Sequence, residues 1–260
     1  GAGKTYTMAT AGMKMKQAGL LKKPMFVVPN HMLEQFSREF MQLYPNARLL
    51  VAAKEDLTRE RRKFLTAKIA SGEWDGIIVT HSSFERIGMS RDYQARFLRE
   101  QIGEYDQLLK DSARGDASKG HRNLIKAIEK QKARREARLK ELLAEDKKDD
   151  GLVFDELGVD YLFVDEAHNF KNLETPTKME RVAGIQTTGS ERALDVYMKS
   201  SYLHENNFGK GLMFATGTPI SNTMVELYTM QRFLDPEGLI RRGIEHFDAW
   251  AATFGEVVDT

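Results

Sequence analysis

The chain has 260 residues, of which 41% are hydrophobic and 30% charged, and its formal net charge is +1. This composition is typical of a soluble globular protein that forms one large domain or two small ones. No run of about 18 apolar residues occurs, so we predict neither a membrane span nor a membrane partner. Cysteine is absent and the six His residues lack ligand spacing. These features exclude thiolate metal sites, argue against zinc and favour a cytoplasmic location.

The chain opens with Gly1, Ala2, Gly3, Lys4 and Thr5, which fit the second half of the phosphate-binding pattern G-x-x-x-x-G-K-[ST]. In such a loop the glycines let backbone N–H groups approach phosphates, the lysine reaches the β- and γ-oxygens, and the hydroxyl holds Mg²⁺. The first glycine of the pattern would precede Gly1, so we expect the chain to begin inside the loop. The pentapeptide by itself is not specific.

Alternating strands and helices are predicted along most of the chain. Short, almost continuously apolar runs predict strands over 24–29, 47–53, 76–81, 161–167 and 211–217. Helices are predicted over 4–18, 30–44, 58–71, 190–205 and 222–234. Asn30 and Ser190 are the expected N-caps of two of these helices. The pattern favours an α/β fold with a parallel sheet covered on both faces, where ligands lie at the carboxyl ends of the strands.

Residues 91–150 interrupt this alternation, because 29 of the 60 are charged and no strand-like run occurs. We predict an inserted helical hairpin, with Tyr93, Phe97, Tyr105 and Leu108 near one face of its first helix. The second arm, 119–140, has nine basic and two acidic residues. It is either a solvated protrusion or an arm that binds a nucleic acid or another partner, since clustered cations neutralise phosphates. The candidate contacts are Arg122, Lys126, Lys130, Arg134 and Arg138.

Two strands are followed directly by polar groups. The sequence YLFVDEAH lifts Asp165 and Glu166 to the carboxyl edge of the predicted sheet, where the phosphate loop would also lie. Asp165 can then hold Mg²⁺, and Glu166 can orient or deprotonate an attacking water. The run GLMFATGT likewise ends in the hydroxyls of Thr216 and Thr218 at the same edge. Turn formation before Pro219 is the alternative role of these two threonines.

In combination these motifs resemble the first RecA-like lobe of a superfamily 2 helicase or translocase, a P-loop NTPase fold. The sequences FATGTPISNTMVELYTMQRFLDP and DEAHNFKN resemble the Swi/Snf-type branch of that superfamily. FVVPNHMLEQFSREFMQLYP and IIVTHSSFERI resemble the segments that touch the nucleic-acid backbone. The four motifs follow the family's order, and the resemblance extends to about Leu239. FDAWAATFGEVV and the charged insertion are also similar to large phage- or plasmid-borne proteins that fuse such a helicase to an adenine-specific DNA methyltransferase.

The resemblance implies a role for each matching residue. Lys4 and Thr5 would hold the ATP phosphates and Mg²⁺, with Asp165 as a further Mg²⁺ ligand and Glu166 at the attacking water. The residues expected to couple the nucleotide site to the nucleic acid are His168, Thr216, Gly217 and Thr218. Those expected to face the nucleic-acid backbone, with helix capping as the alternative, are Pro29, Asn30, His31, Thr80, His81 and Ser82.

On this basis residues 1–90 and 151–240 are expected to form the ATPase lobe, and 241–260 to begin the connection to a second lobe outside this chain. That lobe would contribute arginines that stabilise the transferred phosphate, so the chain alone is expected to be weakly active or inactive. The predicted function is a DNA-dependent ATPase that translocates on double-stranded DNA with ATP and Mg²⁺. The alternatives are a strand-separating DNA or RNA helicase and a non-catalytic scaffold. The expected partners are DNA, the second lobe and a fused methyltransferase domain.

Overall fold

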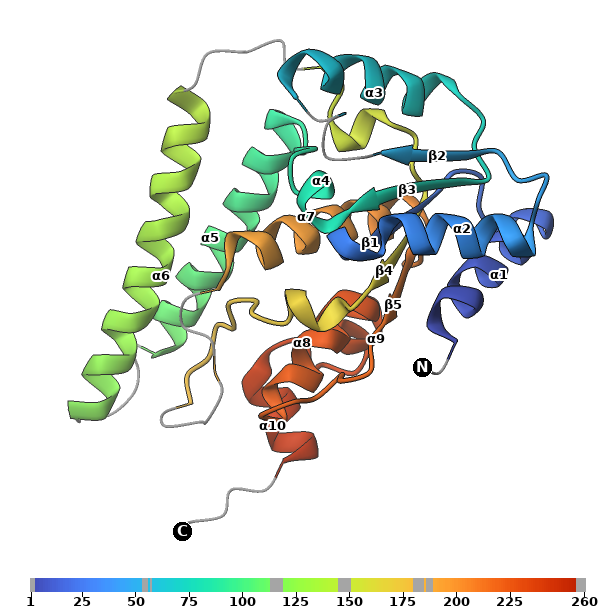
Figure 1. Ribbon diagram of the computed structural model, residues 1–260. Coiled ribbons are helices and arrows are strands. Elements are labelled where there is room, and N and C mark those ends of the chain that lie inside the picture. Colours follow the sequence, from blue (N-terminus) through green and yellow to red (C-terminus); the bar gives the residue numbers. More distant parts are fainter. Residues whose placement is uncertain are drawn as a thin grey trace. The chain divides into compact units, whose positions relative to one another are not determined.

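The computed structural model describes residues 3–52, 56, 58–112, 119–144, 151–179, 185 and 189–255. Gly1 and Ala2, at the start of the expected phosphate loop, lie outside these residues. The architecture is α/β, as predicted, with a parallel sheet and flanking helices (Figure 1). None of the helices in the described residues is long and apolar enough to cross a membrane.

Contacts between Cα atoms divide the chain into two compact units. The first consists of Gly1–Ser90, Lys148–Phe170 and Asp195–Pro219, and the second of Arg91–Lys147, Lys171–Leu194 and Ile220–Thr260. Segments 171–194 and 220–240, which the predicted boundaries place in the ATPase lobe, therefore group with the helical insertion.

The sheet of the first unit has five parallel strands in the order β2-β3-β1-β4-β5. The strands are β1 (Pro24–Val28), β2 (Leu49–Ala52), β3 (Gly76–Thr80), β4 (Tyr161–Asp165) and β5 (Leu212–Ala215), each within a predicted range. Val28 pairs with Thr80 and Asp165 with Ala215, so these strands end at one edge. From β1 the chain crosses to the edge strand β2, returns through β3 and then continues on the other side of β1 with β4 and β5. Such a reversal of direction is where ligands bind in open α/β sheets.

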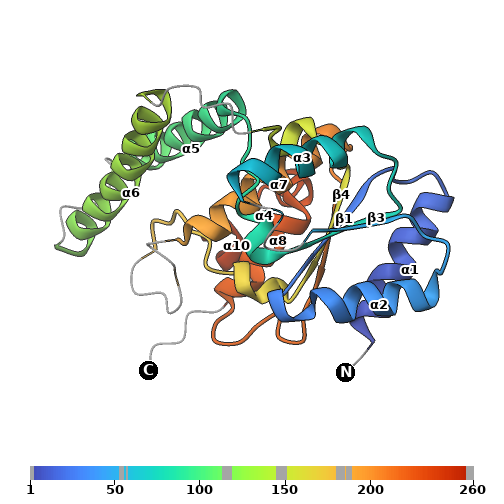
Figure 2. The same cartoon turned by 45° about the horizontal axis from the view of Figure 1, so that its top comes forward.

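Helices cover both faces of this sheet. Figure 2 shows α1 (Lys4–Gln17) and α2 (Leu33–Leu43) on one face, and α3 (Arg59–Ser71) on the other. Under α1 and α2, Phe26 stacks on Phe163 at a centroid distance of 4.7 Å and meets the edge of Phe40 at 5.3 Å. A Cβ at Gly12 would approach the Phe26 ring to 2.7 Å, so glycine lets α1 pack this closely on β1.

The second unit contains the predicted hairpin, formed by α5 (Arg91–Ser112) and α6 (Lys119–Ala144). The four residues expected near one face of its first helix are all buried: Tyr93, Phe97, Tyr105 and Leu108. The unit also contains α8 (Val225–Leu234), α9 (Pro236–Arg241) and α10 (Phe247–Phe254). A separate apolar cluster joins these three helices and includes Tyr228, Leu239 and Trp250.

A buried carboxylate connects several segments of the second unit. Glu174 Oε2 lies 2.7 Å from Arg135 Nη2 of α6, and Tyr105 of α5 donates to Glu174 Oε1 at 2.8 Å. Arg232 of α8 donates to the Glu174 backbone carbonyl at 2.9 Å. Both Glu174 and Arg135 are almost fully buried. The segment after residue 170 is thereby attached to both arms of the hairpin and to α8.

The predicted helix ends are correct in one case and wrong in another. Ser190 Oγ accepts a hydrogen bond from Ala193 N at 3.1 Å and caps α7 (Glu191–Asn206) as expected. Asn30 does not cap a helix through its side chain; it begins the short 3₁₀ helix η1 (Asn30–Met32) that precedes α2. Its Oδ1 instead accepts from Ser82 Oγ at 3.0 Å. The Asn30 side-chain oxygen therefore forms a tertiary hydrogen bond and does not cap a backbone N–H group.

Candidate functional site

The start of α1 and the end of β4 place charged side chains close together in the first unit. Gly3, with φ of 71°, adopts the left-handed conformation and forms the N-cap of α1, which begins at Lys4. Glu166 directly follows β4 and also has a positive φ, of 49°, which is uncommon for a residue with a side chain. The Glu166 carbonyl accepts from the backbone and the side chain of Asn169, at 3.1 and 3.0 Å. This turn directs the Glu166 side chain away from the strand.

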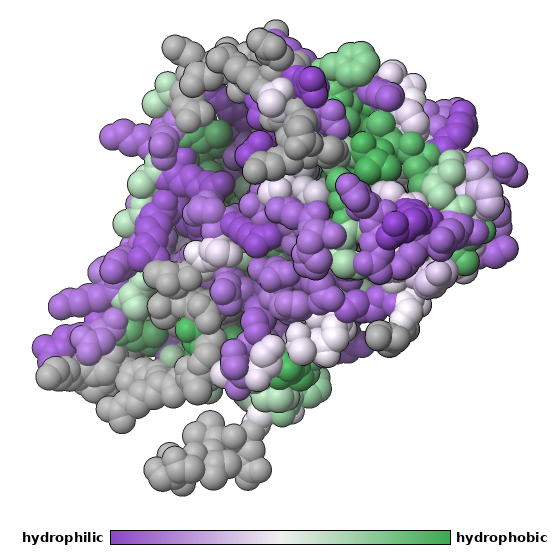
Figure 3. Space-filling view, viewed as in Figure 1, coloured by the Kyte–Doolittle hydropathy of each residue, from purple (hydrophilic) through white to green (hydrophobic). Residues whose placement is uncertain are grey.

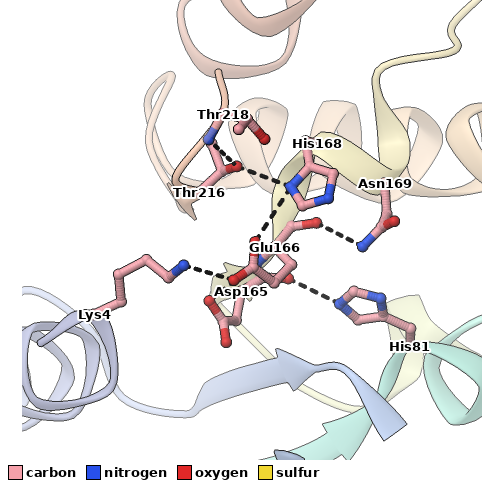
Figure 4. A network of polar contacts seen from close by, with 8 residues as sticks. All are labelled: Lys4, His81, Asp165, Glu166, His168, Asn169, Thr216 and Thr218. Carbon is pink, nitrogen blue, oxygen red and sulfur yellow. Dashed lines mark hydrogen bonds and ion pairs between the residues drawn. The ribbon is translucent and has the colours of Figure 1, made fainter. Parts of the chain in front are cut away.

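Lys4 and Glu166 form an ion pair across 162 residues of sequence (Figure 4). Lys4 Nζ donates to Glu166 Oε1 at 2.6 Å, and both side chains are about one-third exposed, at 32% and 30%. The hydrogen bond to Glu166 is the main cause that raises the pKa of Lys4, so the ammonium stays charged. A partly exposed ion pair of this kind contributes little to stability, because water screens it. The ion pair matters for chemistry, because it places a cation and a carboxylate at the end of a strand.

Asp165 is the buried member of the site, with an exposed fraction of 4%. Its Oδ1 accepts from Glu166 N at 3.0 Å. Burial raises the pKa of Asp165 and the Glu166 charge adds to the rise, although the Glu166 N–H and Lys4 oppose it. The surroundings therefore disfavour the charged form of Asp165. A cation bound beside this carboxylate would stabilise its charge.

His168 connects the end of β4 to the end of β5. It lies in the 3₁₀ helix η4 (Ala167–Phe170), and its Nδ1 is 3.0 Å from Thr216 Oγ1 and 3.2 Å from Glu166 Oε2. Thr218 N in turn donates to Thr216 Oγ1 at 3.1 Å. A Cβ at Gly217 would have open space around it. The structure therefore brings together His168 and the two threonines that the sequence nominated for coupling (Figure 4).

A cavity of about 360 Å³ lies next to the ion pair. Of the predicted site residues it is lined by Gly3, Lys4, Thr5, Pro29, His31, Asp165 and Glu166. Pro29 and His31 were expected to face a nucleic acid, and the structure puts them on the wall of this cavity. Sequence reasoning missed four further lining residues, which are Tyr6, Met32, Gln35 and Glu39. The sequence of α2 contained a signal for two of them. Gln35 and Glu39 are four residues apart and alternate with the buried Phe36 and Phe40, so they lie together on a polar face of the helix.

The remaining nucleic-acid candidates of this unit divide into exposed and buried residues. Asn30 is exposed and its Oδ1 accepts from partly buried Ser82, whereas Thr80 and His81 are buried at 3% and 5%. Thr80 Oγ1 accepts from Ser83 N at 3.1 Å and caps α4 (His81–Phe84). His81 Nε2 lies 2.9 Å from the Asp165 carbonyl (Figure 4). Thr80 and His81 were expected at the surface, but both are buried. The Thr80 hydroxyl caps α4, and His81 Nε2 contacts the Asp165 carbonyl.

A buried lysine helps to position the helix that carries His81. Lys199 of α7 is fully buried, and its Nζ donates to the Phe84 carbonyl at 2.8 Å and to Asp195 at 2.6 Å. The ammonium also lies 4.0 Å from the centre of the Phe84 ring. Burial lowers the pKa of Lys199, while Asp195 favours its charge. The C-terminal carbonyl of α4 is thereby held by a cation.

In the second unit, the five candidate residues of α6 also differ from one another. Arg122, Lys126, Lys130 and Arg134 are exposed, whereas Arg138 is half-buried and paired with Glu191. Among the described residues, no group of three or more His, Asp or Glu is arranged to hold a metal ion.

A further polar cluster in this unit involves Lys171 and Glu226, which lie within the motifs DEAHNFKN and FATGTPISNTMVELYTMQRFLDP. Lys171 Nζ lies 2.9 Å from Glu226 Oε1. The other carboxylate oxygen, Oε2, accepts from Ser221 N at 2.5 Å and from Asn222 N at 3.3 Å. These N–H groups and Lys171 lower the pKa of Glu226 against its burial. The cluster explains why α8 begins at Val225 instead of the predicted 222, because Glu226 holds residues 221 and 222 in a turn.

Comparison with known proteins gives two similarities. A family model described as "Probable helicase domain" matches residues 1–259. The chain is also similar to "Defense against restriction protein B" of Escherichia phage P1, with 26% identity over 188 residues. That alignment covers 68% of this chain but 8% of the phage protein, so the chain spans a small part of that relative's length.

Proposed function

Because the chain belongs to the family of probable helicase domains, we propose that it is the ATP-binding lobe of a nucleic-acid motor that hydrolyses ATP with Mg²⁺. The observation that carries the proposal is the meeting of Lys4, Asp165 and Glu166 beside a cavity at the end of β4. A lysine at a helix start and two carboxylates after a parallel strand are the groups that phosphoryl transfer from ATP requires.

The start of α1 fits a polyphosphate. Its first N–H groups have no partners within the helix, and its first turn contains no acidic residue. The helix has 14 residues, so its dipole adds positive potential at this end. Lys4 would leave Glu166 and bind the phosphate oxygens, which exchanges one anionic partner for another.

The carboxylates fit a divalent cation and a water molecule. Asp165, whose raised pKa reflects an unfavourable buried charge, would be a Mg²⁺ ligand together with the Thr5 hydroxyl. Bound MgATP would supply the γ-phosphorus that water attacks, and ADP would leave with the bridging oxygen. Glu166, once Lys4 has moved, would orient that water and accept its proton. His168 contacts both Glu166 and Thr216, so it would couple a change at the Glu166 carboxylate to the end of β5.

The finer proposal is a motor of the Swi/Snf-type branch that moves along double-stranded DNA without separating its strands. The motifs that resemble this branch support it, and one similar protein is named for defence against restriction. Asn30 and Ser82 would contact the phosphate backbone near the end of β1. A fused methyltransferase and a second lobe are proposed as further parts of the natural protein.

A strand-separating helicase is the second candidate, and the description of the matching family favours it. The two functions differ in a strand-displacement assay. A translocase releases the third strand of a triplex but leaves a duplex intact, whereas a helicase separates the duplex. A scaffold without catalysis is disfavoured, because it does not need a lysine in contact with a strand-end glutamate.

The test is to replace Lys4 in the full-length natural protein. We expect Lys4→Ala to lower DNA-stimulated ATP hydrolysis by about 10²-fold or more, because a charge that stabilises the transferred phosphate is lost. The matched control is Lys14→Ala, which removes an exposed lysine from the same helix and should leave hydrolysis unchanged. Equal hydrolysis by the Lys4→Ala variant and the wild type would contradict the proposal.

A further inference from the structure

One side of α6 packs against the rest of the second unit. Ile128 lies in an apolar cluster with Tyr105 and Leu108 of α5, and Gln131 and Arg135 are also buried. Lys132 contacts Asp106 of α5 at 2.8 Å and Glu136 at 3.3 Å. The basic residues on this side thus have partners within the protein.

The other side of α6 carries a separate set of cations. We call it the basic face; it consists of Arg122, Lys126, Lys130, Arg134 and Lys140, all of them exposed. Glu129 and Glu136 lie at its margin and Glu141 at its C-terminal end. At 100° and 1.5 Å per residue, these five cations lie within about 120° of the helix circumference and along about 27 Å of its axis. Figure 3 shows mostly hydrophilic side chains along α6.

Within the described residues, most of these charges have no partner. In the part of the chain that the structure describes, Arg122, Lys126, Lys130 and Lys140 form no ion pair or side-chain hydrogen bond. Successive cations at 122, 126 and 130 are separated by about 6 Å along the axis. Between Lys130 and Lys140 on this face lie Ala133 and Ala137, which are small and exposed. A long anionic partner can therefore approach the helix closely over several turns.

We propose that the basic face of α6 binds the phosphate backbone of duplex DNA. This inference rests on the proposed function to the extent that DNA is the motor's track. Duplex DNA offers one negative charge per about 1.7 Å of axis, so a row of cations can contact several phosphates at once. Contacts of this kind are independent of base sequence, which suits a protein that moves along DNA. The face lacks the large apolar side chains that anchor helices in membranes, because α6 directs Leu124, Ile125 and Ile128 to other sides.

The experiment compares two triple variants of the full-length natural protein. Arg122→Gln, Lys126→Gln and Lys130→Gln together remove three charges from the basic face. The control combines Lys14→Gln, Arg38→Gln and Lys110→Gln, three exposed cations on α1, α2 and α5. Both variants lose the same net charge, and glutamine has a helix propensity close to those of lysine and arginine. Circular dichroism and thermal unfolding should show that both remain folded.

The measured quantity is the affinity for a random-sequence DNA duplex between 50 and 200 mM KCl, a range over which phosphate contacts weaken strongly. We expect the slope of log K against log[KCl] to become shallower by about 2.7 in the basic-face variant, at about 0.9 per phosphate contact. The control variant should keep the wild-type slope. An unchanged slope in the basic-face variant, or an equal change in both variants, would overturn the proposal.

Two further binding measurements identify the partner. The basic-face substitutions should weaken binding to the DNA duplex more than binding to vesicles that contain phosphatidylserine. A loss confined to such vesicles, or to an RNA duplex, would overturn the assignment to DNA. The result of this experiment can be distinguished from the result of the ATP-hydrolysis test on Lys4. An unchanged salt slope beside an inactive Lys4→Ala variant refutes the basic face alone, and a changed slope beside an active Lys4→Ala variant refutes the nucleotide site alone.

Discussion

Lys4 and Glu166 illustrate how the chemistry of single residues depends on partners far away in the sequence. Their motifs predicted a phosphate-binding cation and a base for water. They did not predict that these two side chains would contact each other at 2.6 Å. In this arrangement Lys4 pairs with the carboxylate that we propose as the base, so Glu166 would become available only when another anion attracts Lys4. The proposed site would thus hold its carboxylate inactive until phosphate is bound.

Asp165 is expected to lower the stability of the folded protein at neutral pH, because its pKa is raised by burial. A raised pKa means that the native state binds the proton more tightly than the unfolded chain, so stability is lost as pH rises through the native value. Asp165→Asn removes this charge and keeps an oxygen that can accept from Glu166 N. We therefore predict a higher melting temperature for Asp165→Asn at pH 7. The advantage should shrink as pH falls and the wild-type carboxyl becomes protonated.

Thermal unfolding of both proteins between pH 4 and 7 measures this difference. Glu73→Gln, a substitution of an exposed carboxylate, is the control and should change the melting temperature little. A lower melting temperature for Asp165→Asn at pH 7, or a difference that does not vary with pH, would contradict the predicted cost of the buried charge.

Among the elements of the second unit, both arms of the hairpin contact one buried carboxylate. Glu174 contacts Tyr105 of α5 and Arg135 of α6, and its carbonyl accepts from Arg232 of α8. We predict that Glu174→Gln lowers the free energy of unfolding by about 3 kcal/mol, because it leaves the buried Arg135 charge without its partner. Urea unfolding followed by circular dichroism measures the change.

The matched substitution for this prediction is Glu129→Gln on the exposed part of α6. It should change stability by less than about 0.5 kcal/mol, as is usual for surface positions. If the Glu174 and Glu129 variants unfold at the same urea concentration, the buried carboxylate does not hold the hairpin in place.

The elements themselves were largely predictable, because their apolar runs encode them locally. All five strands and the helix pair α5 and α6 were expected from run length and charge pattern. The path of residues 171–179 was not predicted, since it depends on contacts such as that of Arg232 with Glu174, 58 residues apart. The role of Asn30 was missed for the same reason, because its oxygen is used by Ser82 from another strand end.

For the whole molecule, the parallel sheet explains how the candidate site is assembled. Strands β1, β3, β4 and β5 end at one edge and carry Pro29, His81, Glu166 and Thr216 immediately after them. Sequence order alone predicted this gathering, because parallel strands share their carboxyl edge. It could not predict which residues would face the cavity and which would be buried. Pro29 and His31 line the cavity, whereas His81 turns inward to the Asp165 carbonyl.

The most direct test of the ATP-hydrolysing site is the full-length natural protein with Glu166→Gln, assayed for both ATP binding and hydrolysis. Glutamine keeps the shape of the side chain but can neither accept a proton nor pair as strongly with Lys4. We predict that MgATP binding by calorimetry is retained or slightly tighter, while DNA-stimulated phosphate release falls by about 10²–10⁴-fold. Glu34→Gln, at an exposed glutamate of α2, should retain both properties. Phosphate release at the wild-type rate by the Glu166→Gln variant would contradict the assignment of the site.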